Sequence, residues 1–244
     1  MTTAAAAPPP AATRAALLAA AGEVFAEHGY HAATVRDICR RAGANVAAVN
    51  YHFGDKERLY VEVLRHAMAR ANARHPFDGG TDPAAPAPER LRAFIFHFLG
   101  RFLDTHAESW LGRLMAKEMI DPSPALDLMI VERIQPMAEQ LRAIVRAIVG
   151  PDCPEESLRL CGFSIVSQCL FYNHCRSVVT RLFPDRPLSP PPLDRLADHI
   201  TQFSLAALQH LPLHRPRPLP ARRRTSPKSP ARTQTPRRPS PHRV

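Results

Sequence analysis

The segment 34–56, TVRDICRRAGANVAAVNYHFGDK, carries the side chains of this chain that are best suited to touch DNA. A short helical pattern over 46–53 places two alanines, a tyrosine and a histidine on one arc, with Asn50 at its edge. Amide, phenol and imidazole groups hydrogen-bond to bases and phosphates, and small residues let a helix approach closely in the major groove. Lys56 follows within reach of a phosphate.

Cap and turn residues predict a helix-turn-helix around these side chains. Thr34 can cap a first helix, and Gly43 can end it because a helix C-terminus favours a residue with positive φ. Asn45 can cap the second helix, whose core anchors are Val49 and Phe53. The inward residues of the first helix are Val35, Ile38 and Ala42.

Two longer helices are expected to support this unit. One spans 14–28, ends at Gly29 and turns Leu17, Ala21, Val24, Phe25 and His28 to one side, with Tyr30 filling the small core. The other follows the break at Gly54 and spans 55–73, with Asp55 as its cap. Its inward residues are Leu59, Tyr60, Val63, Leu64, Ala67 and Met68.

The segment from Arg14 to Ala73 resembles the DNA-binding domain of TetR-type transcriptional regulators. The motifs that carry the resemblance are the helix 34–42, the turn glycine, the sequence VAAVNYHF and the following GDKERLY. The resemblance implies that Thr34 and Arg36 contact backbone or base, that Asn45, Val46, Ala47, Ala48 and Asn50 face bases, and that Tyr51, His52 and Lys56 bind phosphate. It also implies that tilting the helix 55–73 changes the spacing between two reading heads.

One departure from the family pattern concerns base readout. Many relatives have a lysine or threonine where this chain has Val46 and Ala48, so readout would depend on Arg36, Asn50 and apolar contact with thymine methyl groups. The alternative to DNA binding is a plain helical hairpin inside a globular core.

The rest of the chain also predicts helices, and the fold class is all-α. Apolar residues recur at helical spacing over 88–107, 109–120, 125–149, 155–175 and 193–211, and no alternating strand pattern is present. Pro136 predicts a kink or break within 125–149. The Gly- and Pro-rich stretch 75–87 predicts a boundary between an N-terminal head, 13–74, and a helical body for ligand binding and dimerisation, 88–211.

The body resembles the C-terminal domain of a TetR-type subgroup called CerR- or CecR-like. The segment CGFSIVSQCLFYNHCRSVVTRLFP, residues 161–184, carries this resemblance. It implies a bacterial, ligand-responsive regulator, commonly a repressor, that works as a homodimer on a palindromic operator.

Two groups of body residues are candidates for binding. A cluster of aromatic and methionine side chains suits a small apolar or aromatic effector, although each could equally be ordinary core: Phe94, His97, Phe98, Phe102, Trp110, Met115 and Met119. The last two predicted helices have more apolar surface than a single layer needs, which favours pairing across a two-fold axis. The candidates for this interface, which could instead only cover the monomer core, are Gln168, Phe171, Tyr172, Leu196, Phe203 and Leu208.

Metal and catalytic chemistry have little support in the sequence. Cys169, His174 and Cys175 leave open a thiol- or metal-responsive regulator, but their spacing matches no closed tetrahedral site. No nucleophile elbow, phosphate-binding glycine loop, zinc-protease motif or paired carboxylates are present, so we expect no enzyme and no cofactor. The five cysteines contain no C-x-x-C, and no signal peptide or membrane span is recognisable, which favours a cytoplasmic protein.

The basic charge of the chain is confined to its C-terminus. The chain has 32 Lys and Arg against 22 Asp and Glu, and ten of the basic residues lie within 212–244, where there is no acid. The remainder therefore carries 22 residues of each sign and is neutral. The Pro-rich tail 212–244 and the Ala/Pro leader 1–12 predict disorder. The tail could add phosphate contacts, leaving a ligand-independent architectural DNA binder as an alternative, or it could be dispensable.

Overall fold

The computed structural model describes residues 9–76, 80–103, 110–182, 184 and 192–210, and within these ranges all regular structure is helical. The basic tail, residues 1–8 of the leader and parts of three connections, within 77–79, 104–109 and 183–191, lie outside the described residues. The head consists of α1 (Pro10–Ala32), α2 (Val35–Ala42), α3 (Val46–Phe53) and α4 (Lys56–Arg74). The body consists of α5 (Ala87–Leu103), α6 (Leu111–Ile120), α7 (Ala125–Met129), the π-helical segment η1 (Ile130–Ile134), α8 (Gln135–Val149), α9 (Glu155–His174), α10 (Arg176–Leu182) and α11 (Leu193–His210). The all-α prediction is confirmed.

The predicted caps of the helix-turn-helix are confirmed. The Thr34 hydroxyl accepts a hydrogen bond from the Asp37 N–H at 3.1 Å, which satisfies a free donor at the start of α2. Gly43 ends α2 in the left-handed region, with φ of 63°. The Asn45 side chain accepts from the Ala48 N–H at 2.9 Å and caps α3. These residues fix the turn and therefore the direction in which α3 leaves α2.

Helix α1 is longer than the sequence predicted. It begins at Pro10, within the segment expected to be a disordered leader, because proline is suited to the first turn of a helix. Gly29, with φ of 80°, interrupts the helix at the predicted position, but a short helical stretch continues to Ala32. His28, expected at the boundary of the inward face, is exposed beside Glu27.

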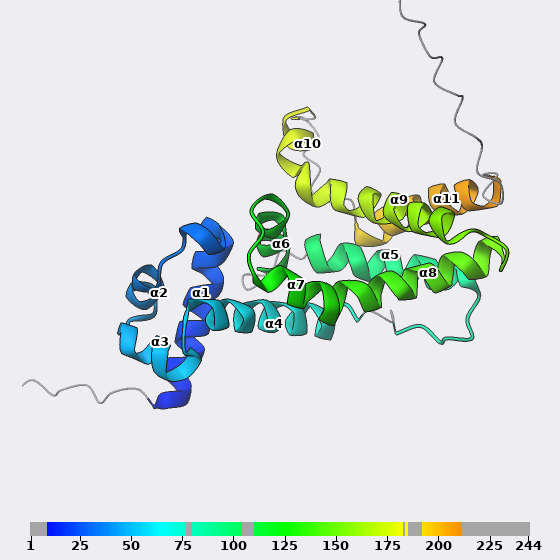
Figure 1. Ribbon diagram of the computed structural model, residues 1–244. Helices are drawn as coiled ribbons and strands as arrows, with labels where there is room; N and C mark the ends of the chain where they lie inside the picture. The colour runs from blue at the N-terminus through cyan, green and yellow to red at the C-terminus, as the bar shows by residue number, and fades with distance from the viewer. Residues whose placement is uncertain (1–8, 77–79, 104–109, 183, 185–191, 211–244) are drawn as a thin grey trace, which may run out of the picture. The chain divides into compact units, whose positions relative to one another are not determined.

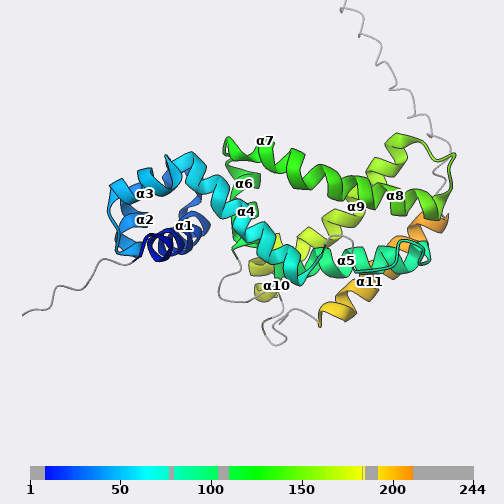
Figure 2. The ribbon, with the colours of Figure 1, turned by 90° about the horizontal axis from the view of Figure 1, so that it is seen from below.

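The body core lies among α5, α8, α9 and α11 (Figures 1 and 2). Helix α11 packs along α5, and α8 packs against both α5 and α9. A kink or break was predicted near Pro136, and here α7 passes into the π-helical segment, which ends where α8 begins at Gln135. Helix α10 was not predicted as a separate element.

The buried contacts of the head do not stop at its last helix. The head core also contains body residues from α7, the start of α6 and Trp110 just before it. The Trp110 ring lies directly on Gly22 of α1, where an added Cβ would come within 2.3 Å of the ring. Only glycine therefore permits this contact, which holds the start of α6 against α1.

Two buried hydrogen bonds join α4 to α6 and α6 to the turn that follows it. The Tyr60 hydroxyl donates to the Glu118 carboxylate at 2.5 Å, and the other oxygen of Glu118 accepts from the Ser123 N–H at 3.0 Å. Tyr60 and Glu118 are 0% and 1% exposed. Burial, followed by the hydrogen bond to Glu118, raises the pKa of Tyr60 above its ordinary range, so its hydroxyl stays a donor.

Two exposed contacts reinforce this joint between head and body. His31 lies within 3.2 Å of the Pro122 carbonyl oxygen, and Arg65 of α4 pairs with Glu132 of the π-helical segment at 2.8 Å. The Arg65 hydrogen bond lowers the pKa of Glu132, which stays charged at neutral pH. The corner 117–123 and the segment 130–134 thus both contact helices of the head.

Tyr60→Phe is expected to lower the free energy of unfolding by about 1–3 kcal/mol, because it leaves the buried Glu118 carboxylate without one of its donors. Chemical denaturation followed by circular dichroism measures this. The matched control is Tyr51→Phe, whose side chain is 80% exposed, and its effect should stay within about 0.5 kcal/mol. Equal effects of the two substitutions would contradict a stabilising role for the buried hydrogen bond.

Candidate nucleic-acid interface and ligand cavities

Helix α3 presents an open face to solvent while two residues anchor it. Val49 and Phe53 are 0% and 7% exposed and hold α3 against the head core, as predicted. On the other side Tyr51 is 80% and Val46 is 45% exposed. Ala47 and Asn50 are also exposed, whereas Ala48 and His52 are half-buried. The exposed face is narrow and carries small side chains, which suits insertion into a major groove.

The three arginines of α2 differ in their partners. Arg40 pairs with Asp37 at 2.6 Å, and Arg41 pairs with Glu27 of α1 at 2.9 Å. The Arg41 hydrogen bond lowers the pKa of Glu27. Arg36 is exposed and makes no hydrogen bond or ion pair with any residue that the structure describes. Its guanidinium is therefore available for an external acceptor.

Thr34 and Asn45, both predicted to contact DNA, are engaged within the head. The Thr34 hydroxyl also donates to the Asp37 carboxylate at 2.6 Å, and this hydrogen bond lowers the pKa of Asp37. The Asn45 side-chain oxygen is occupied by the cap of α3, which leaves its amide N–H groups as donors.

Lys56 does not extend into solvent as expected for a phosphate clamp. Its ammonium lies 4.5 Å from the centre of the Tyr30 ring and donates to the His31 carbonyl oxygen at 3.4 Å. Partial burial lowers the pKa of Lys56. Lys56 and Tyr30 are distant in the sequence and meet only in the folded chain, so the sequence did not predict this contact.

The predicted ligand cluster is not brought together in one cavity. Trp110 is 3% exposed and belongs to the head core, where it packs on Gly22. Met119 is 51% exposed, and His97 lies beside His75, with ring centres 5.8 Å apart. The remaining four residues are divided between two separate cavities and the core. Phe94 lines one cavity, Phe102 and Met115 line the other, and Phe98 belongs to the body core. Helical periodicity in the sequence predicted which residues face inward, but it could not show which of them line the same cavity.

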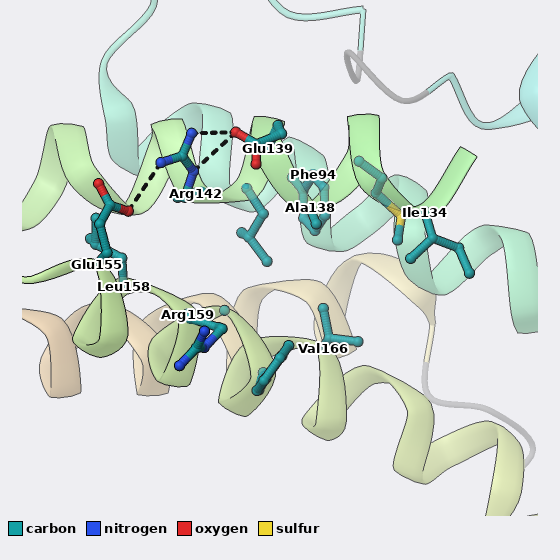
Figure 3. A pocket seen from close by; sticks show the side chains of 13 residues that line it. Phe94, Ile134, Ala138, Glu139, Arg142, Glu155, Leu158, Arg159 and Val166 are labelled. Carbon is teal, nitrogen blue, oxygen red and sulfur yellow. Dashed lines mark hydrogen bonds and ion pairs between the residues drawn. The ribbon is translucent and has the colours of Figure 1, made fainter. Parts of the chain in front are cut away.

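The larger cavity, of about 470 Å³, lies between α8 and α9 with Phe94 of α5 in its wall (Figure 3). Apolar side chains make up most of its lining, including Ile134, Leu158 and Val166. Its rim carries four charged residues, Glu139, Arg142, Glu155 and Arg159.

Three of these rim charges neutralise one another. Arg142 donates to Glu139 and, at 3.0 Å, to Glu155. Hydrogen bonds from Arg142 and Arg146 lower the pKa of Glu155. Arg159 has no hydrogen-bond or ion-pair partner in the described part of the chain, and Figure 3 shows it apart from the other rim charges.

The smaller cavity, of about 50 Å³, contains two arginines. It is lined by Arg101 and Arg133 together with apolar residues of five elements: Met68, Phe102, Leu111, Met115, Ile134 and Met137. Arg101 is 3% exposed and donates to Asn72 at 2.8 Å. Burial, and then repulsion by Arg133, lowers the pKa of Arg101 to about 10.

The predicted dimer-interface residues divide into buried and exposed groups. Leu196 and Leu208 are 3% and 6% exposed and belong to the protomer core, so placing them at an interface was wrong. Phe171 and Phe203 are 48% and 62% exposed. Half-buried Gln168 donates to the Ser204 hydroxyl at 3.4 Å, which joins α9 to α11, and Tyr172 is half-buried against the core.

Sequence reasoning missed two exposed apolar residues of α9. Leu160 and Phe163 are 56% and 61% exposed. Leu160 lies on the same helical stripe as Phe171, three turns away, and this spacing could have identified it. Phe163 lines the larger cavity instead.

The cysteines give little support to a thiol sensor. All five are free, and burial raises the pKa of Cys169 to about 12, so this thiol stays protonated at neutral pH and is a poor metal ligand and nucleophile. No group of three or more potential metal-ligating side chains occurs among the described residues. None of the helices described is long and apolar enough to cross a membrane.

Two family models match the chain and divide it as the helices do. Residues 17–63 match bacterial regulatory proteins of the tetR family, and residues 87–208 match the C-terminal domain of the HTH-type transcriptional dual regulator CecR. The second match alone covers half of the chain.

Individual relatives agree with these models. CecR from Shigella flexneri, a transcriptional dual regulator, is 26% identical over 162 residues, covering 63% of this chain and 72% of the relative. The transcriptional activator FasR from Mycolicibacterium smegmatis is 26% identical over 198 residues, covering 80% of this chain and 83% of FasR.

A solved structure shares the fold. FadR from Bacillus subtilis in complex with stearoyl-CoA has a TM-score of 0.59 at 19% identity, covering 79% of this chain and 97% of FadR. The caps, the open face of α3 and these matches agree, and the chain belongs to the TetR family of DNA-binding transcriptional regulators, with a CecR-type C-terminal domain.

Proposed function

We propose that this regulator binds a palindromic operator as a homodimer and that a small ligand in the body releases it. The observation that carries the DNA-binding part is the open face of α3 beside Arg36 of α2, which has no partner within the described part of the chain. A free guanidinium next to an exposed helix of small side chains can read guanine while the helix lies in the groove.

The contacts with DNA fall into three groups in this proposal. Val46, Ala47 and Ala48 approach base edges and thymine methyl groups, while Arg36 and Asn50 hydrogen-bond to bases. Asn45 also faces bases through its amide N–H groups, and Thr34, Tyr51 and His52 hold phosphate or backbone. Lys56 reaches a phosphate only by leaving Tyr30 and the His31 carbonyl oxygen, so its contribution is smaller than that of a free lysine.

Dimerisation is supported by the exposed apolar residues of α9 and α11. Leu160, Phe171 and Phe203 each expose roughly half or more of their surface. The small Ser164 and Ser167 lie on the same side of α9 as Leu160 and Phe171, which lets a partner helix approach closely. A two-fold axis through this surface would pair α9 and α11 with their copies and place two heads on one side of a duplex.

Ligand release is supported by the cavities and by the joint to the head. The larger cavity has a volume usual for small-molecule sites, and the solved structure of FadR contains stearoyl-CoA. The walls of the two cavities include α8 and the π-helical segment, and Arg65 links that segment to α4. A ligand that favours one arrangement of these helices shifts the population of dimers whose heads match the operator. The resemblance to the family favours a repressor, whose repression ends when the ligand releases it from the operator.

Arg36→Ala is expected to weaken binding to the preferred operator by about 1–3 kcal/mol and to relax base preference, because it removes a direct base contact. Fluorescence anisotropy on selected and random duplexes measures both effects. Arg40→Ala is the matched control, since Arg40 is already neutralised by Asp37, and it should change affinity less and without altering preference. Equal losses for both variants on both duplexes would contradict the role of Arg36.

Phe203→Glu is expected to convert the dimer into a monomer and to abolish operator binding, because it places a charge in an apolar interface. Sedimentation velocity measures the oligomeric state. Ile120→Glu is the control, since Ile120 is apolar and 83% exposed but lies on α6. A dimeric Phe203→Glu variant that binds operator normally would overturn this choice of interface.

A further inference from the structure

The smaller cavity places two guanidinium groups against an otherwise apolar wall. Arg101 comes from α5 and Arg133 from the π-helical segment, and the other lining residues are apolar. Arg133 is half-buried in this space, and a guanidinium that loses solvation without gaining an acceptor is unfavourable. We propose that this cavity binds the carboxylate of an amphipathic organic acid whose apolar part occupies the larger cavity.

Arg133 is the residue that most needs a partner. Its Nε is buried and has no hydrogen-bond acceptor among the residues that the structure describes. No residue in the described ranges forms an ion pair or hydrogen bond with it, and its neighbour Glu132 is directed to Arg65 instead. A carboxylate is the planar acceptor that a guanidinium binds through two parallel hydrogen bonds.

Arg101 gives this site a rigid second wall. Its side chain is almost completely buried, and its hydrogen bond to Asn72 of α4 fixes its position. The buried carboxylate at the joint, Glu118, accepts from the Tyr60 hydroxyl and from the Ser123 N–H. Binding of an anion between Arg101 and Arg133 would therefore not compete with that buried hydrogen bond.

The two cavity volumes limit the ligand. About 50 Å³ has room for one or two water molecules or for a carboxylate of similar size, and it excludes a nucleotide-sized group. About 470 Å³ is large enough for the hydrocarbon part of a small acid. The distribution of charge and volume therefore predicts a compact anionic head and a larger apolar tail.

Ile134 and Met137 line both cavities and separate them. Methionine is unbranched and flexible, so a rotation of Met137 can join the two spaces without moving the backbone. Ile134 ends the π-helical segment that also carries Arg133. A ligand bound across this point would contact Arg133, Met68 of α4 and the wall of the larger cavity at once, which connects ligand binding to the helix that joins the head to the body.

The alternative anchor is Arg159 at the rim of the larger cavity. Arg159 is exposed, so water already solvates its charge and an anion gains less there. Arg133 has no such compensation for its buried Nε. The geometry thus favours the inner site, and Arg159 provides the matched control.

The test compares decanoate with decan-1-ol, which share a ten-carbon chain and differ in charge. The full chain is titrated with each by calorimetry at about 0.15 M salt. Wild type is expected to bind decanoate at least about tenfold more tightly than the alcohol. Arg133→Gln should remove this preference while binding of the alcohol persists, and Arg159→Gln should keep it. Arg133→Lys retains the charge and should keep part of the preference for decanoate. This variant controls for a folding defect in Arg133→Gln.

Equal binding of acid and alcohol to wild type, or loss of the preference in Arg159→Gln instead of Arg133→Gln, would overturn the inner carboxylate site. This inference rests on the proposed ligand-responsive function, so release of a labelled operator duplex is measured in parallel. Arg133-dependent binding of decanoate without release of operator would leave the site standing and overturn ligand release. Operator binding with no affinity for decanoate would overturn the ligand class and leave DNA binding intact.

Discussion

The buried hydrogen bond between the Tyr60 hydroxyl and the Glu118 carboxylate is the constraint on which the arrangement of head and body depends. A carboxylate that is 1% exposed requires donors, and here they come from α4 and from the turn after α6. Because leaving a buried acceptor without its donor costs more than an ordinary hydrogen bond contributes, α4 and α6 are held in one relation. The contact of Trp110 on Gly22 closes the same joint from the side of α1.

This joint ties the position of the helix-turn-helix to that of the body helices α6 and α7. The head core includes body residues such as Leu114 and Met129, so the head cannot move independently of α6 and α7. The same α7 continues into the π-helical segment, whose unusual hydrogen bonding makes it a place where helix geometry can change. In the proposed mechanism, a ligand acts on this segment and on α4, and the head follows because its core is shared.

The sequence predicted the local structure of the head well, because caps and turns depend on neighbouring residues. Thr34, Gly43 and Asn45 each perform the backbone role that their chemistry favours. It could not predict that Trp110 belongs to the head, since the glycine that accommodates the ring lies on α1. Nor could it predict that Lys56 contacts Tyr30, because these residues lie on two different helices, α4 and α1.

Helical spacing in the sequence predicted the inward and outward faces of the body helices. It did not predict how far along each inward face a neighbouring helix covers the side chains. Leu196 and Phe203 are two turns apart on one stripe of α11, yet the first is buried and the second is exposed. Charges were harder still, because a sequence does not show that Arg101 and Arg133 meet in one cavity. The family resemblance supplied the architecture, whereas the assignment of cavities required the packed structure.

Selection of binding sequences from random DNA duplexes, with the full chain at about 0.15 M salt, tests the central claim most directly. A dimer with two equivalent heads should enrich a palindrome whose half-sites are separated by close to a whole number of helical turns. Tight binding by folded protein without any enriched sequence would contradict the account. Binding would then depend on charge alone, and the exposed face of α3 would have no role in reading DNA.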